Sequence, residues 1–456
     1  MGARLTDSVL YAHLWGTAEL RSLFDEGPRI QGWLDVLAAL ARAQAELGII
    51  PGAAASAIAE AASVERLDLD AVAEETRRTG HSTLGLIRGL QAILPAGAKE
   101  WVYYGATVQD ITDTWTAVAA KRVSGVVWRD LRAIEDRLLA LAATHRLTLM
   151  AGRTHGQPGA PITFGLKAAG WSDEVRRHLG RLREAGPRLF VGQLGGGVGT
   201  LAFFGPRALE VRARFCELVG LGDPGVAWLS ARDRPAEFVH LLAMVTATLA
   251  RIGNEVYQLS RPEIGELAEA VVPGAVGSIT MPHKRNPEIA EHLVTLSRLV
   301  RAQAGVVLEG MVAEGERDGR GWKAEWPAMP ECCLLTGAAL ELCLRMLAGL
   351  QVDAAAMRRN LAAGGGMAGS ERVLAALAPA GGKHATQDRL QQVLGAARDS
   401  GASLAEALAR AGLDGVLSGA EREALLRPDP GAAPAMADEV IRRARAARAT
   451  EPEVWP

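Results

Sequence analysis

Three long segments of the chain carry apolar residues at the spacing of an α-helix. Each places its apolar side chains three or four residues apart, so that they fall on one stripe of a helix surface. The first stripe consists of Val127, Leu131, Ile134, Leu138 and Leu141. The second runs over residues 238–259 and the third over residues 293–311. Long helices bury such stripes by packing along one another, so the sequence predicts a long helix bundle.

The remainder of the chain also favours an all-α fold. Alternating runs of β-branched and aromatic residues are nearly absent, and aromatic residues make up only 5% of the 456 residues. We expect an N-terminal helical domain over 1–112, a central long-helix bundle over 113–350 and a C-terminal helical domain over 351–456. The segment GQLGGGVGTLAFFG, which starts at residue 192, lacks the Lys-Ser/Thr pair of a phosphate-binding loop. We interpret its glycines as allowing close approach between chain segments.

Charge and cysteine content narrow the classes of partner. The chain has 50 Lys+Arg against 52 Asp+Glu, a formal net charge of −2, so no global positive field favours nucleic acid or an anionic membrane. A small polar substrate fits better. The four cysteines show no metal-ligand spacing, and the adjacent pair Cys332 and Cys333 would make a poor disulfide. No signal-peptide pattern or uncharged run of about 18 residues is visible, so we expect a cytoplasmic protein with reduced thiols.

One polar segment interrupts the apolar pattern with an unusual set of groups. It reads GSITMPHKRNPE and starts at residue 277. Ser278 supplies a hydroxyl, while Lys284 and Asn286 supply a cation and an amide donor that suit a carboxylate. A Gly-containing loop with such groups can close over a small anionic substrate and exclude water. The alternative is a solvated loop before a helix whose acidic first turn suits the helix dipole.

Three further polar clusters stand at breaks in the helical pattern. His155 and Thr154 lie in AGRTHGQP, and His81 lies in RRTGHSTLG. Thr107 and Gln109 follow a glycine in WVYYGATVQDITDT. Each cluster alone is compatible with a helix cap. Together they indicate a site assembled from distant segments, and His155 has the side chain whose unperturbed pKa suits proton transfer near neutral pH.

These segments carry a specific resemblance. GSITMPHKRNPE resembles the signature GSSxMPxKxNP of the fumarase/aspartase superfamily, with Ile279 in place of the second Ser. YYGATVQDITDT and AGRTHGQP resemble the first and second conserved regions of that superfamily, in the same order along the chain. The resemblance implies an all-α fold whose central bundles form a twenty-helix core in a homotetramer. It also implies active sites that each combine three subunits, and chemistry without a metal or an organic cofactor.

The resemblance implies a β-elimination in which a succinyl compound releases fumarate. Ser278 would be the base that removes a proton from carbon, and His155 would be the acid that protonates the leaving group. His81 stands where adenylosuccinate lyases have their second histidine. Removing a proton beside a carboxylate creates a dianion that fixed donors and cations must stabilise. The implied substrate-binding residues are Thr107, Gln109, Thr154, Lys284, Asn286, Arg317, Ser370 and Arg372.

Two subfamilies share features with this chain. GERDGRGWKAEWPAMPE, which starts at residue 315, resembles 3-carboxy-cis,cis-muconate cycloisomerase, whereas RTHGQP, TGH and GSERVLAAL resemble adenylosuccinate lyase. Tyr103 and Val108 stand where both usually have His and Ser. We favour a lyase that acts on a small substituted succinate or related polycarboxylate, with the lactone-forming cycloisomerase as the alternative. Adenylosuccinate lyase proper and a catalytically silent structural relative rank below both. The leaving group stays open among an amine, a hydroxyl, a nitro group, a hydrazine-like nitrogen and an intramolecular carboxylate.

Overall fold

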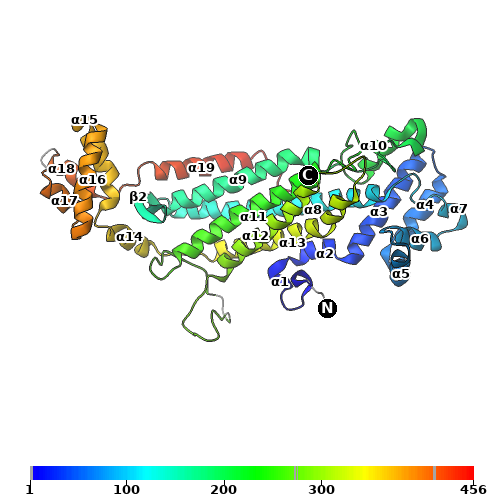
Figure 1. The fold of residues 1–456 in the computed structure, drawn as a ribbon, viewed down its shortest axis with the longest axis horizontal. Helices are drawn as coiled ribbons and strands as arrows, with labels where there is room; N and C mark the ends of the chain where they lie inside the picture. The colour runs from blue at the N-terminus through cyan, green and yellow to red at the C-terminus, as the bar shows by residue number, and fades with distance from the viewer. Residues whose placement is uncertain (1–3, 272–273, 275, 414–416, 456) are drawn as a thin grey trace.

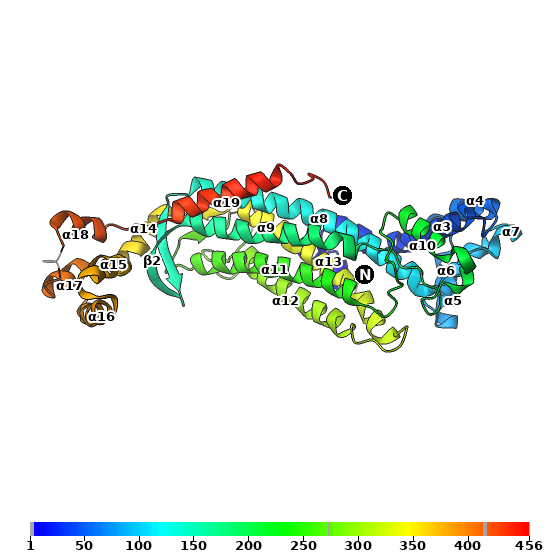
Figure 2. The same cartoon turned by 90° about the horizontal axis from the view of Figure 1, so that it is seen from above.

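The computed structural model describes residues 4–271, 274, 276–413 and 417–455, and it confirms the all-α prediction. The described chain forms an elongated molecule whose long helices run along its length (Figure 1). Five helices make the central bundle: α8 (Val108–Thr144), α9 (Phe164–Leu189), α11 (Asp233–Leu259), α12 (Glu288–Glu309) and α13 (Gly319–Ala348). Viewed from above, α8, α9, α11 and α12 lie side by side along the same axis (Figure 2).

The apolar stripes form the core of this bundle. Val127, Leu131, Ile134 and Leu138 of α8 are all buried to within 1% exposure. Trp128 on the same helix is also fully buried. Burying a large apolar side chain contributes roughly 1.5–3 kcal/mol, so the stripes together account for much of the bundle's stability. The second stripe lies within α11, and the third begins in α12 and ends just beyond it.

The N-terminal region packs at one end of the bundle around a second hydrophobic core. Its helices are α1 (Ala12–Trp15), α2 (Ala18–Phe24), α3 (Glu26–Glu46), α4 (Gly52–Ala61), α5 (Leu69–Thr79), α6 (Leu84–Ala92) and α7 (Ala96–Lys99). Single 3₁₀ turns lie at Leu5–Asp7 and Val64–Arg66. The later helix α10 (Ala208–Leu218) and the 3₁₀ segment Ala202–Arg207 return to this end, where Phe215 joins the same core.

The C-terminal region forms a small third core at the opposite end. Its helices are α14 (Ala354–Ala363), α15 (Ser370–Gly381), α16 (Lys383–Ser400), α17 (Leu404–Arg410) and α18 (Gly419–Leu426), with a 3₁₀ turn at Met367–Gly369. The last helix, α19 (Ala433–Arg448), returns along the bundle beside α9 (Figure 2). The division at residues 112 and 350 therefore stays an interpretation, because α8 starts before the first boundary and α19 lies on the bundle.

A β-hairpin after α8 was not anticipated from the sequence. Strand β1 (Leu149–Thr154) pairs antiparallel with β2 (Gln157–Thr163), and Thr154 faces Gln157 across the turn. The two turn residues, His155 and Gly156, have φ values of 51° and 76°. Two consecutive left-handed residues are the requirement of the tight turns that match the twist of a hairpin. A minor pair, β3 (Leu267–Ala268) with β4 (Gln351–Val352), ties the start of the 269–287 loop to the end of α13.

Helix α11 is long and apolar enough to span a membrane by length and composition alone. However, 72% of its most apolar window is buried inside the protein, as expected for the central helix of a bundle.

Candidate active site

A buried polar cluster lies where α8 begins. The Arg317 Nε donates to the Gln109 side-chain oxygen at 2.7 Å, and its Nη1 donates to the Thr107 hydroxyl at 2.5 Å. Gln109 is fully buried, and its amide nitrogen donates to the Leu229 carbonyl at 3.0 Å. The structure thus brings together three residues that the sequence placed in the site, although Arg317 lies more than 200 positions away along the chain. The guanidinium adds positive charge beside a hydroxyl and an amide, a combination that suits a carboxylate.

A buried carboxylate fixes the backbone under this cluster. Asp110 accepts hydrogen bonds from the backbone N–H groups of Thr107 at 2.8 Å, Gly195 at 2.8 Å and Gly196 at 3.0 Å. The residue has no exposed surface, and this burial raises the pKa of the Asp110 carboxyl to about 7 against the opposing effect of the three N–H donors. Asp110 therefore attaches the Gly-rich loop to the start of α8 and holds Thr107 in place.

A buried ion-pair network extends from the cluster into the bundle. Arg232 donates to Asp113 at 2.7 Å through Nη1 and to Glu325 at 2.9 Å through Nε. Trp322 donates its indole N–H to Asp113 at 3.0 Å. All four side chains are buried, so each charge depends on its partner. Sequence reasoning missed Arg232, because its partners lie 119 and 93 positions away and no local motif marks it.

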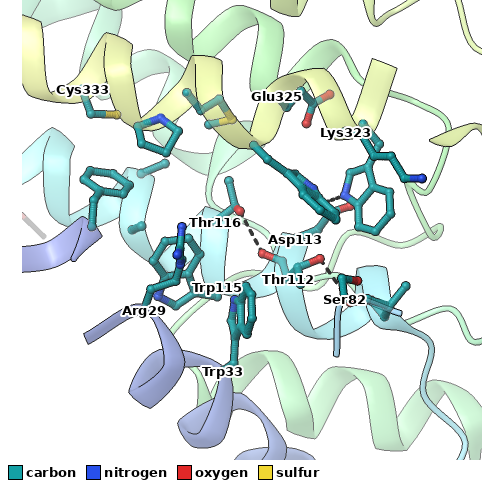
Figure 3. Close-up of a pocket in the computed structure, with 18 of the residues that line it drawn as sticks. Arg29, Trp33, Ser82, Thr112, Asp113, Trp115, Thr116, Lys323, Glu325 and Cys333 are labelled. Carbon is teal, nitrogen blue, oxygen red and sulfur yellow. Dashed lines mark hydrogen bonds between the residues drawn. The ribbon is translucent and has the colours of Figure 1, made fainter. Parts of the chain in front are cut away.

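A large cavity adjoins this network (Figure 3). It has a volume of about 740 Å³ and lies between the N-terminal helices, α8 and α13. His81 and Ser82 form part of its wall, as do Asp113 and Glu325. His81 is exposed, and its Nδ1 accepts the Thr83 N–H at 3.4 Å. The cavity therefore joins His81 to the network that supports Gln109.

His155 and Thr154 lie at the exposed tip of the hairpin. The neighbouring Arg153 turns inward instead, where Nη2 donates to the Glu266 carboxylate at 2.6 Å and Nη1 donates to it at 2.9 Å. Glu266 is fully buried and also accepts from Asn360 at 2.8 Å. This bidentate anchor fixes the base of the turn, so the imidazole of His155 projects from a braced hairpin.

The signature segment forms part of a loop that projects away from the bundle between α11 and α12 (Figure 1). Within it, the Ser278 hydroxyl oxygen accepts the Met281 N–H at 3.0 Å, and Asn286 donates to the Gly277 carbonyl at 3.0 Å. A Cβ at Gly277 would lie 2.4 Å from the Lys284 carbonyl oxygen, so this fold of the loop requires glycine. The Lys284 side chain is exposed and has no ion-pair partner among the described residues.

Ser370 and Arg372 lie at the start of α15, in the C-terminal region. Arg372 donates to the carbonyl groups of Ala424 and Arg427 at 3.1 and 3.0 Å, and it approaches Asp429 at 3.2 Å. These contacts close the end of α18. A role for either residue in substrate binding stays a prediction.

Two of the candidate site residues, Thr107 and His155, are widely separated within one chain. Thr107 caps the first turn of α8, whereas His155 follows its last turn. With 37 residues, α8 is about 55 Å long at 1.5 Å per residue. The hairpin strands of six and seven residues reach only about 20 Å, so folding back cannot bring His155 to Thr107. The start of α8 packs in the core of the N-terminal region, and in Figure 1 strand β2 of the hairpin lies at the opposite end of the bundle from the N-terminal helices.

The sequence profile of a family described as Lyase matches residues 10–302. The chain is a member of the fumarase/aspartase superfamily. It is 42% identical over 375 residues to N-acetyl-S-(2-succino)cysteine lyase of Enterococcus italicus, covering 82% of both chains. It is 38% identical over 415 residues to 3-carboxy-cis,cis-muconate cycloisomerase of Pseudomonas aeruginosa, covering 90% of both. The crystal structure of 3-carboxy-cis,cis-muconate lactonizing enzyme from Pseudomonas putida superimposes with a TM-score of 0.87 at 33% identity, over 96% of this chain and 99% of that one.

Membership confirms the superfamily and the fold expected from the signature segments. The protein is accordingly an enzyme of the fumarase/aspartase lyase superfamily. The roles of individual residues rest on the geometry above and on the chemistry that follows.

Proposed function

We propose that the protein cleaves a 2-substituted succinate by β-elimination, and that the substrate is an S-(2-succino) thioether such as a succinylated cysteine derivative. The similarity to N-acetyl-S-(2-succino)cysteine lyase, over 82% of both chains, carries the choice of substrate. A thioether was not among the leaving groups expected from the sequence. It suits the same site, because a thiolate is a better leaving group than an amine or a hydroxyl.

The reaction separates a proton and a thiolate from neighbouring carbons. Ser278 removes the proton from the carbon beside one carboxylate, and the electron pair forms the double bond of fumarate while the carbon–sulfur bond breaks. His155 gives a proton to the departing sulfur, so the products are fumarate and a free thiol. An ordinary serine hydroxyl is a weak base, so Ser278 must act as an alkoxide stabilised by loop closure and by Lys284.

The substrate carboxylates require fixed donors and positive charge. Arg317, Thr107 and Gln109 already form a hydrogen-bonded cluster, which reduces the entropy lost when a carboxylate binds. Lys284 and Asn286 would approach from the loop, and Thr154 from the hairpin. Each preorganised donor that favours the transition state contributes about two to three orders of magnitude in rate.

A complete site then requires several copies of the chain. The separation along α8 supports this, as do exposed apolar residues on helices of the bundle. Met244 on α11 and Leu299 and Val306 on α12 are each at least 40% exposed, although they lie on long helices of the central bundle. Leu299 and Val306 are seven residues apart and share one helix face, which suits a helix packed against another copy. A homotetramer with a shared twenty-helix core satisfies both observations.

The lactone-forming cycloisomerase is the second candidate, because the P. aeruginosa relative covers more of the chain at 38% identity. Separate assays distinguish the two. The enzyme is incubated with N-acetyl-S-(2-succino)cysteine and with 3-carboxy-cis,cis-muconate, and fumarate, free thiol and lactone are each measured. Equal amounts of fumarate and thiol with no lactone would support the proposal. Lactone formation without fumarate would select the cycloisomerase.

A substitution tests the mechanism. Ser278→Ala should lower turnover by at least about a hundredfold, the scale of a general base, with the oligomer intact by size-exclusion chromatography. Lys121→Ala is the control, because the side chain of this half-buried lysine makes one hydrogen bond among the described residues, to the Gly220 carbonyl at 3.3 Å, and lies outside the proposed site. Turnover near that of the unmodified enzyme for Ser278→Ala would remove this residue from the reaction.

A further inference from the structure

The cavity beside His81 is larger and more aromatic than a succinyl group requires. Its volume of about 740 Å³ falls in the range of sites for whole small molecules, roughly 300–1,000 Å³. The aromatic side chains in its wall are Phe24, Trp33, Trp115, Phe238, Trp322 and Trp326. In Figure 3, Trp33 and Trp115 face the cavity from below, across from α13. Such walls suit a ligand with an apolar body.

The charges that face the cavity do not balance. Asp113 and Glu325 are the carboxylates in its wall, and both are already paired with the buried Arg232. The cations in the wall are Arg29, Arg77 and Lys323, and no ion pair joins any of them to a carboxylate among the described residues. Arg232 offsets one of the two carboxylates, so the three cations exceed the one negative charge that remains, and the net positive charge of the wall favours an anionic ligand.

Arg29 is placed to receive that anion. Its guanidinium carbon lies 6.0 Å from the centre of the Trp33 ring, and Figure 3 shows the side chain extending beside Trp115 toward α13. The Arg29 Nε is buried and has no hydrogen-bond partner within the described part of the chain, and the same holds for the Trp33 indole N–H. Buried donors without partners are costly, and a ligand that draws the Arg29 guanidinium into the cavity and accepts from it offsets this cost.

We infer that this cavity binds the leaving group of the substrate, and that Arg29 binds a carboxylate carried by that leaving group. The inference rests on the proposed function. The shared wall supports it, because His81 lines the cavity and Asp113 both lines it and lies 3.4 Å from the Gln109 amide nitrogen. A thiol leaving group with an apolar body and a terminal carboxylate, such as an N-acylated cysteine, has the matching chemistry.

The test uses an S-methylated analogue of the leaving group, which cannot react, so it does not depend on turnover. Isothermal titration measures binding of N-acetyl-S-methylcysteine and of its amide, which differ only in the carboxylate. We expect the acid to bind at least about tenfold more tightly than the amide, the scale of a charge-assisted hydrogen bond. Arg29→Met should abolish this preference, and Arg29→Lys should retain part of it. Arg42→Met is the matched control, because Arg42 lies on the same helix and pairs with Glu46 at the surface.

A second variant covers the case in which Arg29→Met does not fold. Thr116→Phe adds a ring to the cavity wall and should weaken the binding of both ligands. Equal binding of acid and amide, binding of neither, or an acid preference that survives Arg29→Met would each overturn the inference. Fumarate release is measured separately: release without an acid preference leaves the proposed function standing and removes this inference. An acid preference that depends on Arg29, without fumarate release from any succinate, would remove the proposed function and leave Arg29 as a carboxylate-binding residue of this cavity.

Discussion

The separation of the site residues along α8 leads to a quantitative prediction about mixed oligomers. Even with the hairpin folded back, more than about 30 Å remain between the Thr107 cluster and His155 in one chain, from 55 Å of helix less 20 Å of hairpin. A succinylated cysteine spans only about 10 Å in extended form. If the proposed reaction uses both Arg317 and His155, a productive site takes them from different copies of the chain.

Two inactive variants should then restore each other. In an equal mixture of Arg317→Leu and His155→Gln chains, a site is intact when one copy supplies the native arginine and another supplies the native histidine. Each condition holds for half of the random combinations, so about a quarter of the sites should be intact in a closed homo-oligomer. The mixture should recover about a quarter of the activity of the unmodified enzyme.

The assay mixes the two chains in mild denaturant, reassembles them by dialysis and follows fumarate absorbance. Each variant taken alone through the same cycle should stay inactive. A second mixture, Thr107→Val with Arg317→Leu, is the matched control. These two residues are hydrogen-bonded within one chain, so every site takes both from the same copy and always lacks one of them. Failure of the first mixture to recover, despite reassembly of the oligomer, would refute the reasoning from helix length.

Two further predictions concern the buried charges. Arg232→Met leaves Asp113 and Glu325 as uncompensated buried carboxylates. It should lower the free energy of unfolding, measured by urea titration, by about 3–5 kcal/mol. The exposed control Arg251→Met should change the free energy of unfolding by less than about 1 kcal/mol. The pKa of Asp110 is raised by burial to about 7, so its contribution to stability is present below the unfolded pKa and is lost as the pH rises through 7. The stability advantage of the unmodified protein over Asp110→Asn should accordingly fall between about pH 4 and pH 7 and change little at higher pH, and an advantage that grows with pH would contradict this assignment.

The parts of the fold that could be predicted are those set by local periodicity. The stripe from Val127 to Leu141 lies wholly inside α8, because a repeating three-and-four spacing fits a helix and few other structures. The hairpin escaped prediction because its strands contain Gly152, Pro158 and Gly159 in place of alternating β-branched residues. The local signal was the His155–Gly156 pair, whose left-handed conformations make a two-residue turn.

The candidate site residues also differ in whether the sequence alone could indicate them. Ser278, His155 and Thr107 could be proposed as site residues because each lies in a short segment with an unusual composition. Arg232 and Arg29 could not, since their importance arises from groups that only the folded chain brings near them. A lone arginine on an amphipathic helix resembles any surface arginine in sequence. Only burial and the absence or presence of partners separate the two cases.

The Gly-rich segment that starts at residue 192 is a case in which the sequence indicated the backbone geometry and the structure shows what that geometry does. A phosphate-binding loop uses glycines to present backbone N–H groups to an anion, and the sequence of this segment argued against such a site. In the structure the backbone N–H groups bind an anion within the protein itself, because Gly195 and Gly196 donate to the carboxylate of Asp110. A Cβ at Gly195 would lie 2.7 Å from the Ala227 Cβ, and Gly196 has a φ of 66°, so neither position accepts another residue without strain. Because Asp110 also binds the Thr107 N–H, the glycines indirectly fix the hydroxyl that contacts Arg317.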